Sequence, residues 1–539
     1  MTVLKGIILD PVNRRQFRGE VHFENGRISR LKETDNVPEQ YIMPGFVDAH
    51  IHIESSMLVP SEFARLAVRH GTVATISDPH EIANVCGMEG VNFMIENGKK
   101  VPLKFHFGAP SCVPATVFET AGAELTVDDI RELLARDDIY YLAEMMNWPG
   151  VLNDDPDVMA KVKAAHDAGK PVDGHAPGLK GEQAKKYASA GITTDHECFT
   201  KEEALDKLRY GLKIAIREGS AAKNYEALID LMHDYAPEIM FCSDDKHPDD
   251  LLVGHINELV SRTLKRGFDL FDVLHSACVL PVRHYSMNVG LLQPGDPADF
   301  IVVDDVENMH VSQTWINGDC VYDGEVRFDK VSVTPINNFT AHKTSPNDFK
   351  CFTNTDSETV PVIEALDGEL ITNRIEAILP KENGELLADP ANDILKIAVV
   401  NRYEKANPGV GFIKNFGIKN GAIASSVGHD SHNIIVVGSS DEYLSRVVNL
   451  IMDAKGGIAA VQGDVEEVLP LPIGGIMTDA DGGEAGRAYH KLNVMAREMG
   501  STLKAPFMLI SFMALLVIPS IKMSDKGLFD AQKFEFIKL

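Results

Sequence analysis

The chain alternates apolar runs and amphipathic stretches through most of its first half. Between Ile42 and Asp245, a short apolar or β-branched run repeatedly ends in polar, often ionisable residues, and a stretch of helical composition follows. Eight such runs occur: YIMPGFVDAHIHIE, GTVATISDPHE, LKFHFGAPS, YYLAEMMN, KPVDGHAP, GITTDHE, LKIAIREGSA and EIMFCSDD. Apolar residues return every three or four positions in the intervening stretches, which predicts amphipathic helices in PSEFARLAVRH, TVDDIRELLARD, DVMAKVKAAHDAG and NYEALIDLMHDYA.

Alternating strands and helices in this number predict an α/β fold built on a closed parallel (β/α)8 barrel of the TIM type. In such a barrel the reactive groups gather at the carboxyl ends of the strands, and the polar clusters of this chain follow just those ends. An open doubly wound sheet is the alternative. It would not by itself bring the ends of the first, fourth, fifth, sixth and eighth strands to one point.

Short β-like segments flank the predicted barrel on both sides. GEVHFENGRISRL precedes it and GDPADFIVVDDVENMHVSQTWINGDCVYDGEV follows it, with hairpin signals at Asn25-Gly26 and Asn317-Gly318. We expect them to pair into one small β domain. From about Asn338 the strand-like segments DILKIAVVNRY, SHNIIVVGS and GGIAAVQGD indicate a further α/β domain. The predicted division is therefore 1–41 and 285–337 for the small β domain, 42–284 for the barrel and 338–539 for the C-terminal domain.

Charge and cysteine content narrow the classes of partner and compartment. A formal net charge of -27 repels phosphate backbones and anionic lipid head groups, so neither nucleic acid nor a membrane is an expected partner. The cysteines are seven, an odd number without CxxC spacing, which favours a reducing compartment such as the cytoplasm. The opening MTVLKGIILDPVNRR lacks the apolar core of a signal peptide. The apolar run from Ala505 to Ile521 is short for a bilayer span, so we expect a buried helix or strand pair.

Candidate metal ligands end several of the predicted strands. His50 and His52 are alternate residues of one strand, so both imidazoles point the same way and can reach one ion, although such a pair also occurs as ordinary strand residues. Further histidines and carboxylates end other runs, and this ligand mix suits Zn, Fe or Mn. These residues are Glu144, His175, His196 and Asp244. The alternative interpretation is a set of separate, solvated loop residues.

Four histidines and two carboxylates suffice for two metal ions if one carboxylate bridges them. Ions about 3.5 to 4 Å apart can hold a hydroxide, because a bound ion lowers the pKa of water from 15.7 toward roughly 7. Asp244 is then placed to accept the proton and to pass it to a leaving group.

These residues resemble those of the amidohydrolase superfamily, and within it those of the bacterial and archaeal adenine deaminases. The resemblance spans almost the whole chain and rests on MPGFVDAHIHIESSM, VATISDPHEIANV, DGHAPGL, TTDHECF, IREGSAAKN, CSDDKHPDDL, GHINELV, IASSVGHDSHNIIVVG and PFMLISFMALLVIPSI. The histidine pair alone indicates only the superfamily. The blocks SDPHEI, REGSAAKN and HDSHNI are typical of this branch.

The resemblance implies a ligand set and an activity. His50, His52 and Asp244 would hold the first ion, His175 and His196 the second, with Glu144 between them; Mn is the first choice, and Fe or Zn the alternatives. Hydantoinases and dihydroorotases usually bridge with a carboxylated lysine, so the glutamate points away from cyclic-amide hydrolysis. The implied reaction is hydrolytic deamination of adenine to hypoxanthine and ammonia, with hydroxide attacking C6 and Asp244 shuttling the proton.

The reaction also needs an acid for ring atom N1 and contacts for the purine. Glu81 and Glu197 are both candidates for the acid, and each could instead be a salt-bridged loop carboxylate. The candidates for substrate contacts are Asp78, His80, Arg217, Ser220 and Asp245. Alternatives are ligation of an additional ion or a turn at Asp78 and His80, an ion pair at Arg217, and a helix-capping or orienting role for Asp245.

Some features leave more than one interpretation open. The cluster from His429 to Asn433 would close over the barrel mouth or line a subunit contact. The resemblance implies a homo-oligomer, with a dimer as the first candidate. The same ligand set is compatible with deamination of another purine or related heterocycle, and a non-catalytic barrel that binds purine or metal is the remaining alternative.

Overall fold

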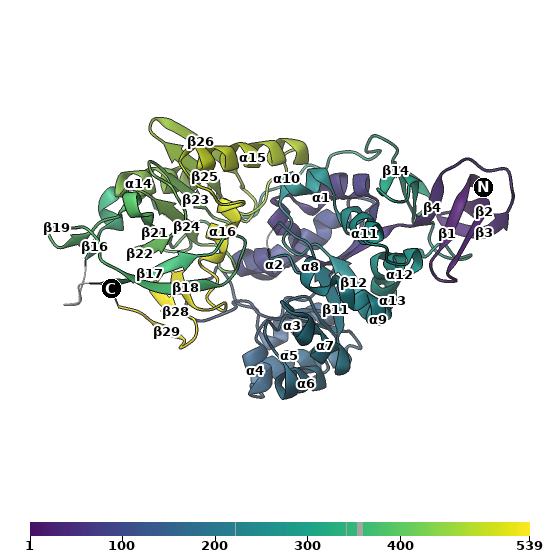
Figure 1. Cartoon of the computed structure of the whole chain (residues 1–539), viewed down its shortest axis with the longest axis horizontal. Coiled ribbons are helices and arrows are strands. Elements are labelled where there is room, and N and C mark those ends of the chain that lie inside the picture. Colours follow the sequence, from purple (N-terminus) through teal and green to yellow (C-terminus); the bar gives the residue numbers. More distant parts are fainter. Residues whose placement is uncertain (221, 341, 353–358, 539) are drawn as a thin grey trace.

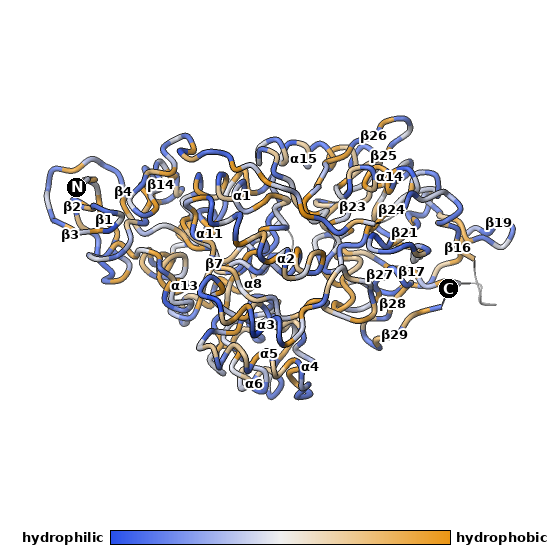
Figure 2. The backbone as a smooth tube through the Cα atoms, turned by 180° about the vertical axis from the view of Figure 1, so that it is seen from behind, coloured by the Kyte–Doolittle hydropathy of each residue, from blue (hydrophilic) through white to orange (hydrophobic). Residues whose placement is uncertain are grey.

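Figure 1 shows the computed structural model of the chain, which describes residues 1–220, 222–340, 342–352 and 359–538. The molecule is elongated. A small β-sheet with the N-terminus lies at one end, the barrel lies in the middle, and the C-terminal domain lies at the other end. Figure 2 shows hydrophobic residues distributed through all three regions, and the largest buried cluster extends from the barrel into the C-terminal domain.

Eight short parallel strands form the barrel. They are β5 (Phe46–Ile51), β6 (Thr72–Ser77), β7 (Lys104–Phe107), β8 (Leu142–Met145), β9 (Val172–Gly174), β10 (Thr194–Asp195), β11 (Lys213–Arg217) and β12 (Ile239–Cys242). Each corresponds to one of the apolar runs of the sequence, although the run LKIAIREGSA ends at Ala221, which lies outside the described residues.

The barrel closes through contacts between neighbouring strands in chain order. β5, β6 and β7 pair in parallel, as do β8 and β9, and β10, β11 and β12. Bridges from Ala109 to Leu142 and from Ile51 to Asp244 join these groups, and an amide hydrogen bond of 2.9 Å to the Val172 carbonyl joins β9 to the segment before β10. The predicted (β/α)8 barrel is confirmed, and the open doubly wound sheet is excluded.

Helices follow the strands on the outside of the barrel. They are α1 (Pro60–Ala67), α2 (His80–Gly98), α3 (Val127–Leu134), α4 (Trp148–Leu152), α5 (Pro156–Asp167), α6 (Gly181–Ser189), α7 (Lys201–Arg209), α8 (Tyr225–Leu228), α9 (Met232–Tyr235), α10 (Pro248–Val253), α11 (Ile256–Lys265), α12 (Leu270–Leu274) and α13 (Leu280–His284). The stretch NYEALIDLMHDYA is not one helix as its periodicity suggests, because a 3-10 turn over Ile229–Leu231 separates α8 from α9.

Strands from both sides of the barrel form one seven-stranded sheet, in the order β15-β14-β13-β4-β1-β2-β3. Its members are β1 (Thr2–Asp10), β2 (Arg15–Glu24), β3 (Arg27–Glu33), β4 (Tyr41–Pro44), β13 (Phe300–Asp305), β14 (His310–Ile316) and β15 (Asp319–Tyr322). Two hairpins turn at the predicted positions. Asn25 and Gly26 have φ of 52° and 77°, and Asn317 and Gly318 have 49° and 79°, as tight turns between antiparallel strands require.

The first predicted barrel run divides between two sheets. Ile42 in β4 pairs with Ile8 and Val302 of the small sheet, and the barrel strand β5 begins only at Phe46. Gly45 lies at the division, where a side chain would meet Val73 at 2.2 Å. We therefore propose to place this domain boundary after Pro44 rather than before Ile42, and we keep the other boundaries as predictions.

The C-terminal domain is built on an eight-stranded sheet in the order β18-β17-β22-β21-β24-β23-β25-β26. The strands are β17 (Val360–Ala365), β18 (Thr372–Ala377), β21 (Ile394–Val400), β22 (Gly409–Lys414), β23 (Ala422–Ser425), β24 (Ile434–Gly438), β25 (Gly457–Gln462) and β26 (Val465–Pro470). Its helices are α14 (Asp441–Ala454), α15 (Gly482–Glu498) and α16 (Pro506–Phe512). Smaller sheets contain β16 (Cys351–Phe352), β19 (Lys381–Glu382) and β20 (Glu385–Leu386), and β27 (Ile521–Ser524), β28 (Gly527–Asp530) and β29 (Glu535–Phe536).

The apolar run from Ala505 to Ile521 is a buried element of this domain. It forms α16, a turn and the first residue of β27. Within the described residues, none of the helices combines the length and the apolar character needed to span a bilayer. Figure 1 shows α15 and α16 on the side of the domain that faces the barrel, and residues of α15 contact α10.

Lys522 is fully buried beside this run. Its Nζ donates to the carbonyl oxygens of Leu370 over 2.5 Å and Phe512 over 3.0 Å. Burial lowers the pKa of Lys522 from its ordinary 10.5 to about 7. The unfolded chain therefore binds more protons than the folded chain between these two values, so this group makes the wild type gain stability as the pH rises above 7.

We expect Lys522→Met to change the pH dependence of unfolding. Relative to the variant, the wild type should gain up to about 1.4 kcal/mol of unfolding free energy per pH unit from pH 7 toward 9. Melting temperatures of both proteins at each pH measure this, and Lys526→Met, which removes an exposed lysine of the same hairpin, is the control. A constant difference between wild type and Lys522→Met across this range would contradict the expectation.

Candidate metal centre

Two histidines leave the end of β5 and face each other. The Nε2 atoms of His50 and His52 lie 3.2 Å apart, and the rings meet edge to face with their centres at 4.9 Å. Both side chains are buried. The alternation of side chains along a strand thus places both imidazoles at the barrel mouth.

Glu144, in β8, lies at the centre of the predicted ligand residues, which we call the ligand cluster: His50, His52, Glu144, His175, His196 and Asp244. Its Oε1 lies 3.3 Å from Nε2 of His52, and its Oε2 lies 2.7 Å from Nδ1 of His175 and 3.0 Å from Nε2 of His196. The two carboxylate oxygens therefore face different histidines, as a bridging ligand requires. Burial opposes the ionisation of Glu144, but the surrounding histidines, His175 first, lower its pKa well below the usual value.

Asp244 joins the cluster from the loop after β12. Its Oδ1 lies 3.1 Å from Nε2 of His52 and 3.6 Å from Nε2 of His50. Its backbone has a φ of 57°, in the left-handed region that aspartate tolerates better than most residues. The Asp244 amide donates to the carbonyl of His50 over 2.9 Å. The link that closes the barrel therefore also places this carboxylate against the two histidines.

The cluster fits a divalent metal centre. Separations of 2.7 to 3.6 Å between these nitrogen and oxygen atoms suit ligand atoms that each lie about 2.0–2.2 Å from a shared ion. Two imidazole nitrogens at 3.2 Å cannot both carry a proton, so either one donates a hydrogen bond to the other or both face a shared cation. The donor set matches the preferences of Zn, Fe or Mn. The groups that could hold an ion contain the six predicted residues His50, His52, Glu144, His175, His196 and Asp244, and one of these groups also contains Asp78 and His80.

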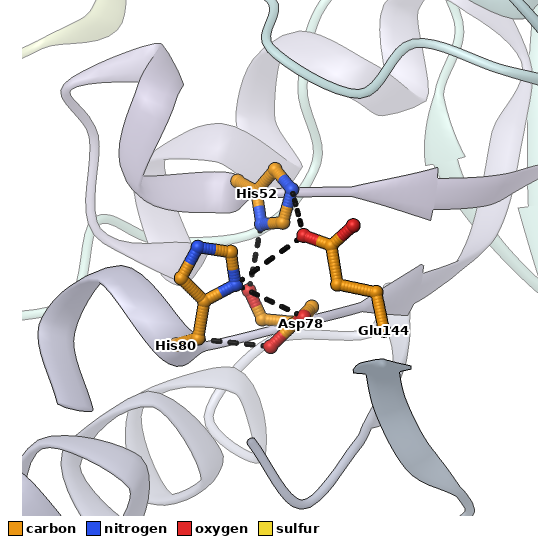
Figure 3. Close-up of side chains that lie close together, drawn as sticks. All are labelled: His52, Asp78, His80 and Glu144. Atoms are coloured by element: carbon orange, nitrogen blue, oxygen red, sulfur yellow. Dashed lines mark hydrogen bonds and ion pairs between the residues drawn. The ribbon is translucent and has the colours of Figure 1, made fainter. Parts of the chain in front are cut away.

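His80 and Asp78 form the layer next to the cluster (Figure 3). Nδ1 of His80 lies 3.0 Å from Oδ2 of Asp78 and 3.5 Å from Oε1 of Glu144, and Nδ1 of His52 lies 3.2 Å from the Asp78 carbonyl. His80 lines the cavity above the cluster, whereas Asp78 does not. Asp78 therefore orients the two rings, and of these two substrate-contact candidates only His80 reaches the space for a ligand.

Glu81, the second residue of α2, is held by two histidines of the C-terminal domain. Its Oε1 contacts Nδ1 of His429, its Oε2 contacts Nε2 of His432, and Nε2 of His80 lies 3.4 Å from Oε1. Burial opposes ionisation, but the charge of these histidines lowers the pKa of Glu81 well below the usual value. Although burial acts against it, Glu81 raises the pKa of His429 to about 9. Glu81 and His429 therefore hold a proton between them at neutral pH.

These contacts decide between the two placements predicted for the cluster from His429 to Asn433. The segment lies over the barrel mouth, and His429 and Asp430 line the cavity. The sequence flagged the segment for its ligand-like residues, but nothing in its local pattern identified Glu81 as the partner.

Glu197 faces the same cavity but is tied to Arg217. The guanidinium contacts both oxygens of Glu197, and its Nη1 donates to Oδ2 of Asp244 over 2.5 Å. Arg217 thus forms the ion pair that was the alternative to a purine contact. Burial opposes the charge on Asp244, but Arg217 and the histidines lower the pKa of Asp244 well below the usual value.

The two remaining substrate-contact candidates differ in position. Asp245 lines the cavity, and its Oδ1 accepts a hydrogen bond of 2.5 Å from Ser55. Ser220 does not line the cavity: its hydroxyl donates to Asp250 over 2.5 Å and accepts from the His247 amide over 2.9 Å. The turn after β11 keeps the Ser220 hydroxyl within the neighbouring loops, so the structure does not support a substrate contact there.

One wall of the cavity is apolar and was not predicted. Most of it comes from the C-terminal domain: Leu370, Phe512, Leu515, Val517 and Ile518, with Met146 from the barrel. The apolar run that contains four of these residues was expected to be a buried helix or strand pair. Its hydrophobicity could not reveal that one of its faces covers a polar site.

The chain matches two family profiles. The profile described as "Amidohydrolase family" covers residues 41–321, and the one described as "Adenine deaminase C-terminal domain" covers residues 369–535. A protein named adenine deaminase from Methanosarcina mazei is 51% identical over 99% of this chain and 98% of its own length. Another of that name, from Salinibacter ruber, is 53% identical over 96% and 95%.

A solved structure of beta-aspartyl dipeptidase from Fervidobacterium islandicum aligns with 61% of this chain and 100% of its own, at 14% identity and a TM-score of 0.47. That likeness is too weak to carry an argument. The barrel and the histidine and carboxylate groups at its strand ends, together with the matching profile, define an amidohydrolase. Within that class, the chain belongs to the adenine deaminase family.

We expect His175→Ala to weaken metal binding at least about tenfold, because it removes a nitrogen from the centre of the cluster. The measurement is metal content after dialysis against a graded chelator. His106→Ala is the matched control, since His106 is a buried histidine of the barrel strand β7 that lies outside the cluster. Equal metal retention by the two variants would argue against His175 as a ligand.

Proposed function

We propose that the protein hydrolyses adenine to hypoxanthine and ammonia. The observation that carries the proposal is the convergence of four histidines, Glu144 and Asp244 in a chain whose relatives named adenine deaminase match it over almost its whole length. The presence of a glutamate at the centre, in the place where cyclic-amide hydrolases usually have a carboxylated lysine, is consistent with deamination.

We assign the ligands as follows. His50, His52 and Asp244 would hold one ion, His175 and His196 a second, and the two oxygens of Glu144 would bridge them. Mn is the first choice and Fe or Zn the alternatives, since all three accept this ligand mix. When bound, such ions supply Lewis acidity that makes water a nucleophile at neutral pH.

Asp244 moves the proton of the attacking water. Its Oδ1 faces the two histidines while Oδ2 is held by Arg217, so the carboxylate is ionised and fixed in orientation. It accepts the proton at the cluster and delivers it to the departing amino group, which requires one residue to act as base and then as acid. Arg217 acts through Asp244 as a positioning residue, and because it also lines the cavity it stays a candidate for a contact with the purine.

Glu81 is the better of the two candidates for protonating N1 of the ring. Both carboxylates are held ionised, but the partner of Glu197 is the Arg217 guanidinium, which does not release a proton, whereas the partner of Glu81 is the His429 imidazolium, which can. Glu81 lines the cavity and shares a proton with His429. His80 and Asp245 also line the cavity and can contact the purine edge, while Asp78 supports His80 from behind.

We propose that the protein is a cytoplasmic homo-oligomer, with a dimer as the first candidate, and that it takes adenine and water as substrates. The net charge of -27 argues against nucleic acid or an anionic membrane as a partner.

The direct test is ammonia release from a panel of purines by protein reconstituted separately with Mn, Fe and Zn. We expect adenine to be turned over, with guanine and isoguanine slower. Preference for another purine would move the assignment to that substrate. Stoichiometric metal without hydrolysis of any purine would favour a non-catalytic barrel.

Replacing each candidate acid separates a chemical from a structural role. We expect Glu81→Gln to lower kcat by about 10²–10⁴, the usual contribution of a positioned acid, while metal content is unchanged. Glu197→Gln should instead lower the melting temperature more than Glu81→Gln does, because it leaves the buried Arg217 with one fewer anionic partner.

His432 is a positioning residue in this scheme, since it touches Glu81 and does not line the cavity. His432→Gln should therefore shift the pH profile of kcat while leaving metal content unchanged. A kcat in Glu81→Gln close to that of the wild type would reject Glu81 as the acid.

A further inference from the structure

The cavity above the ligand cluster has a polar floor and an apolar roof. The floor consists of the histidines and carboxylates of the barrel mouth. The roof comes from the segment between α16 and β27 together with Leu370, both in the C-terminal domain. A flat heterocycle bound here would expose its reacting edge to the floor and its remaining surface to the roof.

Contacts of Lys522 hold the parts of the roof together, and contacts of His429 join the roof to the floor. Lys522 donates to the carbonyl oxygens of both Leu370 and Phe512, which ties the two sides of the roof together. The ring of His429 stacks on that of Phe512, with centres at 5.2 Å and an angle of 23°. Since His429 also contacts Glu81, the roof is positioned by the same residue that meets the floor.

The cavity is small. Its free volume is about 40 Å³, room for roughly three water molecules. Adenine, a bicyclic base, is larger than this, so side chains that line the cavity have to move or part of the base has to extend through the opening. Any substituent on the base adds to the volume that has to be accommodated.

A wider groove of about 730 Å³ lies next to the cavity. It is lined by the loop 113–117, by residues 147–149 and by the C-terminal residues 519, 531, 532 and 534. Two side chains, Met146 and Val517, line both the cavity and the groove. They form a partition, one side chain from the barrel and one from the C-terminal domain.

We infer that the partition of Met146 and Val517, with Leu515 beside it, restricts the site to free purine bases and excludes purines substituted at N9. The inference rests on the proposed function, because C6 must face the ligand cluster for hydrolysis. N9 lies at the far end of the base from C6 and therefore points to the roof and the partition. A methyl, ethyl or ribosyl group at N9 would need the space that these side chains fill.

The test compares adenine with 9-ethyladenine in Val517→Ala and Leu515→Ala, both for equilibrium binding by calorimetry and for turnover. Val517 is half-buried, so its truncation carries little risk for folding. Each variant should improve 9-ethyladenine relative to adenine by about tenfold or more, the usual effect of small volume changes in an apolar pocket.

Leu516→Ala is the matched control. Leu516 is a buried leucine of the same segment that lines neither the cavity nor the groove, so its truncation should leave the ratio as in the wild type. A wild type that binds both compounds equally, or truncations that leave the ratio unchanged, would overturn the inference. If the wild type does not deaminate adenine, the proposed function fails. The ratio of the affinities for 9-ethyladenine and adenine then still tests the inference about the partition.

Discussion

The buried charge of Glu144 is the constraint on which the site and its surroundings depend. An isolated buried carboxylate would cost several kcal/mol, so it persists only among partners of opposite charge or with a metal ion. Here the partners come from the ends of β9 and β10, which follow β8 in barrel order, and from the end of β5, three strands before it. Only a closed barrel brings these ends to one point, and the exchange of backbone hydrogen bonds between the ends of β5 and β12 completes the closure.

The closure of the barrel also positions the carboxylate of Asp244. Asp244 bridges β12 to β5 with its backbone and faces the histidines with its side chain, so a displacement of one strand would move the other and the carboxylate together. Arg217, from the strand next to β12, neutralises Glu197 and holds the second oxygen of Asp244. One cation thereby fixes two carboxylates, whereas Glu81 contacts two histidines of the C-terminal domain instead.

The C-terminal domain completes the site. It supplies the histidines that hold Glu81 and the apolar residues that cover the ligand cluster, so a polar floor and an apolar roof meet across the boundary between the two domains. Exclusion of water by such a roof strengthens the electrostatic interactions below it. A barrel without this domain would lack both contributions.

The sequence by itself determined the barrel, the hairpins of the small sheet and the residues that converge at the mouth. These follow from local rules, because alternation along a strand and its end position decide where His50, His52 and Glu144 point. Tertiary structure alone showed that Glu197 pairs with Arg217 while Glu81 meets His429, removed Ser220 from the cavity and placed Val517 in the roof. Glu81 and His429 are 348 residues apart, and their contact depends on how two separately folded domains pack. The periodicity of a segment does not indicate which distant segment it packs against. The apolar run from Ala505 to Ile521 therefore predicted only a core element, although one of its faces covers the site.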